Sequence, residues 1–162
     1  MAVTDPNSAA KIEPLHFQFE SDFVESWNCI PMRVRLYLDT CGVKLKLVHW
    51  TALAEAERQQ LVEMSCETEA EAEVYRDRLM ELVRDRYGSE PSLLPIPESP
   101  AWDNLDVVPE TVAAKAQELE LAIAPQQWSN LTRLQRFALI KLSRPSHENR
   151  NFLPALQEFG LA

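Results

Sequence analysis

Glycine is scarce in this chain, with 3 residues among 162. All-β folds need many turns with positive φ, which glycine supplies, so the low count argues against such a fold. It also argues against a glycine-rich phosphate loop. Neither a Walker loop, a dinucleotide fingerprint nor a Gly-x-Ser-x-Gly elbow occurs. The chain therefore lacks the motifs that identify nucleotide-binding enzymes and serine hydrolases.

Basic residues and long apolar runs are also in short supply. The 16 Lys and Arg residues face 25 Asp and Glu, which gives a formal charge of −9. Such a field repels nucleic acid and anionic membrane surfaces, so neither is expected as the main partner. No apolar run approaches the roughly 20 residues that span a bilayer, and the first residues show no signal segment. We expect a cytoplasmic protein.

Cysteine and histidine are few and badly spaced for a metal site. The 3 cysteines, Cys29, Cys41 and Cys66, include no Cys-x-x-Cys pair. Zinc and iron–sulfur sites are usually built from ligands that lie close together in the sequence. A nucleophile built from Cys29 or Cys66 with His49 or His147 has no support in the local sequence. The abundant carboxylates are expected on solvated helix faces. We therefore predict a protein that is not an enzyme and that holds neither a metal nor a cofactor.

What the sequence does contain is helical periodicity. It predicts an all-α single domain of about six or seven helices with extended links over residues 15–162, after a tail at 1–14. Pro31 starts one helix and Gly42 ends it. Thr68-Glu-Ala-Glu71 is a capping box that opens a long helix running to Gly88. The alternating segment 43–48 is interpreted as a link rather than a strand.

The densest apolar run, residues 137–142, predicts a helix at the centre of the domain. The polar segment 143–151 follows it directly and contains the main candidate binding residues: Arg144, His147, Glu148, Asn149, Arg150 and Asn151. Their side chains can bind carboxylates, phosphates or a partner's backbone, or they can cap helix ends and tie down a turn. Lys44, Lys46 and His49 form a second, smaller candidate patch.

Sliding the sequence along itself gives one offset that stands out, 78 residues. At this offset Trp50 meets Trp128, Pro31 meets Pro109, and Arg58 meets Arg136. We predict two repeated helical units, 30–88 and 108–161, joined by a proline-rich connector at 89–109.

Two blocks of sequence resemble the nitrate reductase-associated proteins, a family found mainly in cyanobacteria. The first contains Cys29-Ile-Pro-Met-Arg-Val-Arg-Leu-Tyr-Leu-Asp-Thr-Cys-Gly-Val-Lys-Leu-Lys-Leu47 and His49-Trp50. The second contains Leu134-Gln-Arg-Phe-Ala-Leu-Ile-Lys-Leu-Ser-Arg-Pro145 and His147-Glu-Asn-Arg-Asn-Phe-Leu-Pro-Ala-Leu-Gln-Glu-Phe-Gly-Leu161. The middle of the chain, 67–127, resembles the family only in its general character and not in particular motifs.

The resemblance implies an accessory protein of assimilatory nitrate reduction, with nitrate reductase as its partner and no assigned catalytic residues. We therefore expect a non-enzymatic maturation or stabilising factor that acts by protein–protein binding. The alternative is a carrier of a molybdenum-cofactor precursor or of the metal itself. A mostly apolar pocket with convergent Arg and His side chains favours the carrier, whereas an exposed apolar patch favours protein binding.

Overall fold

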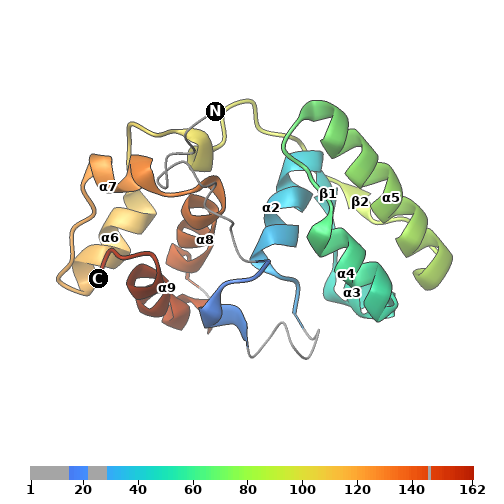
Figure 1. Cartoon of the computed structure of the whole chain (residues 1–162), viewed down its shortest axis with the longest axis horizontal. Helices are drawn as coiled ribbons and strands as arrows, with labels where there is room; N and C mark the ends of the chain where they lie inside the picture. The colour runs from blue at the N-terminus through green and yellow to red at the C-terminus, as the bar shows by residue number, and fades with distance from the viewer. Residues whose placement is uncertain (1–14, 22–28, 146) are drawn as a thin grey trace, which may run out of the picture.

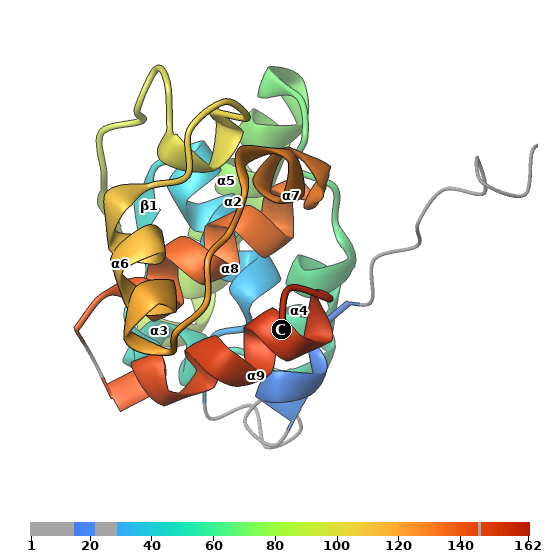
Figure 2. The ribbon, with the colours of Figure 1, turned by 90° about the vertical axis from the view of Figure 1, so that its left-hand side faces the viewer.

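The structure, a computed structural model, describes residues 15–21, 29–145 and 147–162. The predicted tail at 1–14 lies outside these residues. Eight α-helices and a two-stranded sheet are found in the described part, which confirms the all-α class. Helices α2 to α5 occupy one side of the molecule and α6 to α9 the other, with α2 and α8 side by side at the centre (Figures 1 and 2).

The short 3-10 helix η1 (Gln18–Glu20) comes first in the chain and packs against the second side of the molecule. The first side contains α2 (Met32–Cys41), β1 (Val43–Lys44), α3 (Leu47–Ala52), α4 (Glu55–Glu63) and α5 (Glu69–Tyr87). Helix α5 packs against α2, α3 and α4. The predicted capping box is present, because the Thr68 hydroxyl accepts the Glu71 N–H at 3.1 Å and the Glu71 carboxylate accepts the Thr68 N–H at 3.1 Å. These two bonds fix where α5 begins.

Gly42 ends α2 as predicted, with φ of +77°. Its N–H donates to the Leu38 carbonyl at 2.8 Å, which closes the last turn of the helix. A Cβ at this position would lie 2.7 Å from the Leu94 carbonyl oxygen. Glycine is therefore required at this position for two reasons, the left-handed backbone and the close approach of a second segment.

The interpretation of 43–48 as a link was wrong at both of its ends. Val43–Lys44 forms β1, which pairs antiparallel with β2 (Ser92–Leu93), and Val43 lies opposite Leu93. Leu47 and Val48 already belong to α3. The alternation stops at Lys46 because the His49 ring reaches back to accept the Lys46 N–H at 3.1 Å, which starts a helix that apolar periodicity alone does not show.

The connector 89–109 is more firmly held than a surface link. Its second part forms η2 (Ala101–Asp103), and the Trp102 side chain is buried against Phe137, with ring centroids 5.1 Å apart. The Arg136 Nε donates to the Trp102 carbonyl at 2.7 Å, and the Trp128 Nε1 donates to the Asn104 carbonyl at 2.9 Å. The connector thus supplies part of the second side's core.

The second side contains α6 (Glu110–Glu118), α7 (Pro125–Asn130), α8 (Arg133–Ser143), η3 (His147–Asn151) and α9 (Phe152–Glu158). Helix α8 is buried nearly all round, as its apolar run predicts; its buried residues are Leu134, Arg136, Phe137, Ala138, Leu139, Ile140, Leu142 and Ser143. Lys141 joins the two sides of the molecule, because its Nζ lies 3.0 Å from the Asp39 carboxylate on α2.

Helix bounds recur at the predicted offset. Helices α6, α7 and α8 each begin 78 residues after α2, α3 and α4, and α3 and α7 also end at matching residues. Trp50 and Trp128, which the offset aligns, are both fully buried. The third helical residue caps its helix at two matching positions: His49 accepts the Lys46 N–H and Gln127 accepts the Ala124 N–H. The duplication stays a prediction, and superposition of the two units tests it.

Candidate functional site

A strap made of residues 17–21 brings Glu20 into the middle of the molecule. The Phe17 and Phe19 rings stack with centroids 5.2 Å apart, and the Phe159 ring packs on both at 5.0 and 6.2 Å. The Phe19 N–H donates to the Glu158 carboxylate at 3.1 Å. These contacts dock the strap on α9 and aim the next residue, Glu20, at the beginning of α2.

Glu20 then acts as the cap of α2. The first residue before this helix, Pro31, offers no side-chain cap, and the Glu20 Oε1 accepts the Met32 N–H at 3.3 Å instead. A carboxylate at a helix N-terminus is favoured by the orphan N–H groups and the helix dipole. The Glu20 side chain is only 6% exposed, and its Oε2 has no hydrogen-bond partner among the described residues.

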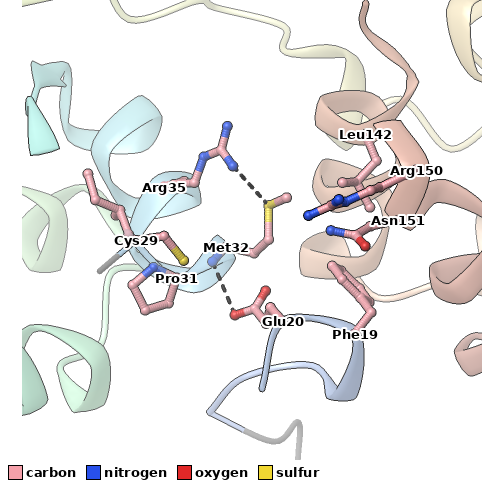
Figure 3. A pocket seen from close by; sticks show the side chains of 10 residues that line it. Phe19, Glu20, Cys29, Pro31, Met32, Arg35, Leu142, Arg150 and Asn151 are labelled. Atoms are coloured by element: carbon pink, nitrogen blue, oxygen red, sulfur yellow. Dashed lines mark hydrogen bonds between the residues drawn. The ribbon is translucent and has the colours of Figure 1, made fainter. Parts of the chain in front are cut away.

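A pocket of about 110 Å³ opens beside Glu20. Residues from the strap, the beginning of α2, α8 and η3 line it: Phe19, Glu20, Cys29, Ile30, Pro31, Met32, Arg35, Leu142, Arg150 and Asn151. Arg150 and Asn151 point into the pocket from η3, opposite Glu20 and Cys29, while the Arg35 guanidinium lies on the α2 side near the Met32 sulfur (Figure 3). The walls are mainly apolar, and the polar groups converge at one place.

Burial dominates the electrostatics of Glu20. Desolvation raises the pKa of its carboxyl to about 7, against the lowering effects of the Met32 N–H, Arg35 and Arg33, and Glu158 adds a smaller raising effect. The carboxyl therefore changes its protonation state near neutral pH. The expectation that carboxylates lie on solvated helix faces was wrong for this residue, because the aromatic contacts of the strap hold it inside.

The structure divides the main candidate segment. Arg150, which is exposed, and Asn151, which is half-buried, line the pocket. Arg144, just after α8, is also exposed but lies outside the pocket lining. Asn149 is half-buried, and the side chains of His147 and Glu148 lie outside the described residues, as does Ser146. The alternative role as a helix cap fails for Asn151, whose side chain makes no cap bond to α9.

The second candidate patch is only partly a surface. Lys44 and Lys46 are exposed, but the His49 side chain is 6% exposed and packs edge-on against the Tyr87 ring at 4.7 Å. Burial, and then the Lys46 charge, lower the pKa of His49. His49 therefore caps the beginning of α3 from a buried position, whereas the two lysines are exposed. Neither lysine nor His49 lines the pocket, so the two predicted patches are separate places.

The cysteines differ in accessibility. Cys41 and Cys66 are buried, and burial raises the pKa of Cys41 to about 12 and that of Cys66 to about 11. Such thiols stay protonated and unreactive at neutral pH. Cys29 is half-buried and lines the pocket. Among the described residues, no group of three or more His, Cys, Asp or Glu is placed to hold a metal ion.

Sequence reasoning missed Glu20 and Arg35 as site residues. Gln18–Glu20 forms a 3-10 helix in which Gln18 is exposed and Glu20 is buried, so the apolar–polar alternation around the phenylalanines does not mark Glu20 as a buried residue. The missing cap before α2 was the one local signal, because Pro31 leaves the first N–H groups of that helix without a side-chain acceptor.

Within the described ranges, no helix combines the length and apolar character needed to cross a membrane.

Comparison with known proteins agrees with the resemblance found in the sequence. No curated protein and no solved structure matches the chain. One family matches residues 16–159, a range that holds the strap, the pocket and all of the described helices. The chain belongs to the family of conserved nitrate reductase-associated proteins.

Proposed function

We propose that this protein is a non-enzymatic accessory factor of assimilatory nitrate reductase, and that it acts in the cytoplasm by binding the reductase. Membership of the family supports an association with that enzyme. The observation that carries the binding mode is an exposed apolar surface beside α3. It consists of Lys44, Lys46, Leu47, Val48 and Tyr87, and we call it the α3 surface.

The α3 surface has the composition of a protein-binding patch. Leu47 is 50% exposed and Val48 51% exposed, at the first two positions of α3. Tyr87, at the end of α5, is also exposed, and its ring contacts His49, which lies on α3 with Leu47 and Val48. Adjacent apolar side chains on a surface are typical of places that bind a partner. Two exposed lysines beside them, on a chain of net charge −9, favour an acidic region of the reductase.

The proposed mechanism is selective binding of one state of the reductase. A protein that binds only the open, cofactor-free form shifts the population toward that form by its differential affinity. Binding of this kind keeps the form competent for cofactor insertion and needs no catalytic residue. Arg144, exposed at the end of α8, is a second contact expected from the sequence.

Co-purification with nitrate reductase tests the proposal. The tagged wild-type protein should retain the reductase from extracts of nitrate-grown cells. The double variant Leu47→Ser, Val48→Ser should retain about tenfold less, because removing two apolar contacts from an interface costs roughly 1–2 kcal/mol. The control is Leu105→Ser, Val107→Ser, which makes the same change at residues 45% and 58% exposed in the connector. Failure of the wild-type protein to retain the reductase would discard the proposal. Equal retention by both double variants would discard the α3 surface alone.

A second candidate function is that of a carrier, and the pocket beside Glu20 favours it. Its mainly apolar walls and converging polar groups from η1, α2 and η3 are features of small-molecule sites. From the sequence, the expected cargo is a molybdenum-cofactor precursor or the metal. Native mass spectrometry of the protein from nitrate-grown cells tests this function: a bound pterin or molybdenum supports it, and uniformly ligand-free protein speaks against it.

A further inference from the structure

One carboxylate oxygen of Glu20 is buried and unpaired within the described part of the chain. Its side chain is more than nine-tenths buried, one oxygen accepts the Met32 N–H, and the other has no partner among the described residues. Buried polar groups in proteins are nearly always hydrogen-bonded, to protein, to water or to a ligand. Glu20 lines the pocket, but its Oε2 is shielded from a water-sized molecule there, so a ligand in the pocket completes its bonding only once the side chain turns toward the pocket.

The polar groups around the pocket are mostly donors. Arg150 and Asn151 extend into it from η3, and the Arg35 guanidinium lines it from α2 (Figure 3). A guanidinium has its donors arranged in a planar fork that matches two oxygens on one atom, and an amide adds a further N–H donor. This set of donors selects an anion with a planar O–X–O edge, such as a carboxylate or nitrate.

Glu20 fits such an anion only when it carries a proton. Ionised, it would repel the anion; protonated, it becomes a donor. The charged groups that act on it are Arg33 and Arg35 from α2 and Glu158 from α9, while Arg150 from η3 lines the same pocket. Desolvation outweighs all of these effects, and the pKa of about 7 leaves much of Glu20 protonated at neutral pH.

The size and walls of the pocket limit the anion. An apolar cavity of about 150 Å³ accepts benzene, so about 110 Å³ suits a smaller molecule of few non-hydrogen atoms. The apolar part of the lining, Phe19, Ile30, Pro31 and Leu142, suits a short hydrocarbon body attached to the charged group.

We propose that this pocket binds a small monoanion with a planar O–X–O edge, whose oxygens accept hydrogen bonds from Arg150 and Asn151. The Glu20 side chain turns toward the pocket when the anion binds, and its Oε2–H then donates a third hydrogen bond. A short carboxylate and nitrate share this chemistry. Binding then keeps a proton on Glu20, so affinity falls with rising pH, by up to about tenfold per unit once Glu20 ionises in the free protein. The proposal rests on the pocket alone, and the α3 surface contributes none of its residues.

Isothermal titration of the full chain tests the proposal, with acetate, butyrate, nitrate, sulfate and butylammonium as probes at matched ionic strength between pH 6 and 9. Acetate, butyrate or nitrate should bind at pH 6, and comparison of the three identifies the source of the O–X–O edge. Arg150→Ala should weaken this binding at least tenfold. Arg144→Ala, which removes an exposed arginine outside the pocket lining, should leave it unchanged.

Glu20→Gln separates a proton-coupled anion site from other possibilities. The amide is a permanent donor, so this variant should bind equally at pH 6 and pH 8, whereas the wild-type protein loses affinity. Cys29 reports the location, because it lines the pocket while the other two thiols are buried. The bound anion should slow alkylation of Cys29 by iodoacetamide at least threefold.

Three outcomes would overturn the proposal. The first is that none of the three monoanions binds at pH 6. The second is that binding is unaffected by Arg150→Ala. The third is that butylammonium binds and Glu20→Gln abolishes its binding, which would make Glu20 an acceptor for a cation instead of a donor.

Discussion

Glu20→Gln should stabilise the protein at alkaline pH although it removes a helix cap's charge. Burial raises the pKa of Glu20 from the ordinary 4.5 to about 7 in the folded protein. Between these values the folded state binds more protons than the unfolded state, so the free energy of unfolding falls as pH rises. The contribution is fully present below pH 4.5 and is lost once pH passes 7.

The size of the effect follows from the same two values. At about 1.4 kcal/mol for each unit of pKa difference, ionisation of the buried carboxyl costs on the order of 3 kcal/mol above pH 7. Glutamine keeps an oxygen for the Met32 N–H and carries no charge to desolvate. Glu20→Gln should therefore exceed the wild-type protein in unfolding free energy by about 2–3 kcal/mol at pH 8 and by nearly nothing at pH 4.5.

Urea denaturation followed by tryptophan fluorescence at pH 4.5, 6 and 8 measures this difference, because Trp50, Trp102 and Trp128 are buried and report unfolding. The control is Glu158→Gln, which makes the same chemical change on a less buried carboxylate of α9 that accepts the Phe19 N–H. It should show no comparable gain at pH 8. A difference between Glu20→Gln and wild type that stays constant from pH 4.5 to pH 8 would refute the reasoning.

Three further predictions concern the parts that position the site. Gly42→Ala should destabilise the protein by more than about 2 kcal/mol in urea denaturation, because a left-handed alanine costs roughly 1–2 kcal/mol and its Cβ also meets the Leu94 carbonyl. Gly88→Ala, with φ of +97° and open space around it, should show the backbone cost alone, and equal losses would contradict the close approach. Arg136→Met should lower the thermal midpoint through a loss of about 2–4 kcal/mol, because it leaves the buried carbonyl it bonds, on the connector, unpaired. Arg133→Met, which breaks an exposed ion pair to the same connector, should cost less than about 1 kcal/mol; the reverse order would be inconsistent with the buried role. His49→Gln should keep the cap of α3, because the glutamine oxygen can accept the same N–H. The lowered pKa of His49 in the folded protein means that the free energy of unfolding falls as pH drops below 6.5, and this variant should remove that fall. An unchanged pH profile of stability from pH 5 to 7 would show that His49 does not cause the fall.

The family match covers both ends of the chain segment that builds the pocket. The matched range of 16–159 begins at the strap and ends at Phe159, the ring on which the strap's two phenylalanines pack. Contacts between the two ends of the range bury Glu20, so the pocket is made from the part of the chain that matches the family.

Local chemistry in the sequence was enough to predict the helical class and several helix ends. Gly42 and the Thr68 capping box end or begin helices through bonds that span four residues or fewer. The apolar run in α8 can be identified as the centre of the fold without knowledge of its partners, because residues 137–140 and 142 place apolar side chains around most of that helix. The offset of 78 likewise appears in the sequence and recurs in the helix bounds.

Only the tertiary structure decided where the polar candidates lie. Glu20 is buried through contacts with Met32, 12 residues away, and through its strap's bond to Glu158, 139 residues from Phe19. No periodicity within one segment encodes a distance of that kind. For the same reason the sequence grouped His49 with Lys44 and Lys46 as surface, whereas packing against Tyr87 buries it and leaves the lysines in solvent. Short-range hydrogen bonds depend on neighbouring residues and can be predicted from the sequence, whereas the desolvation of a group depends on all the segments that pack around it.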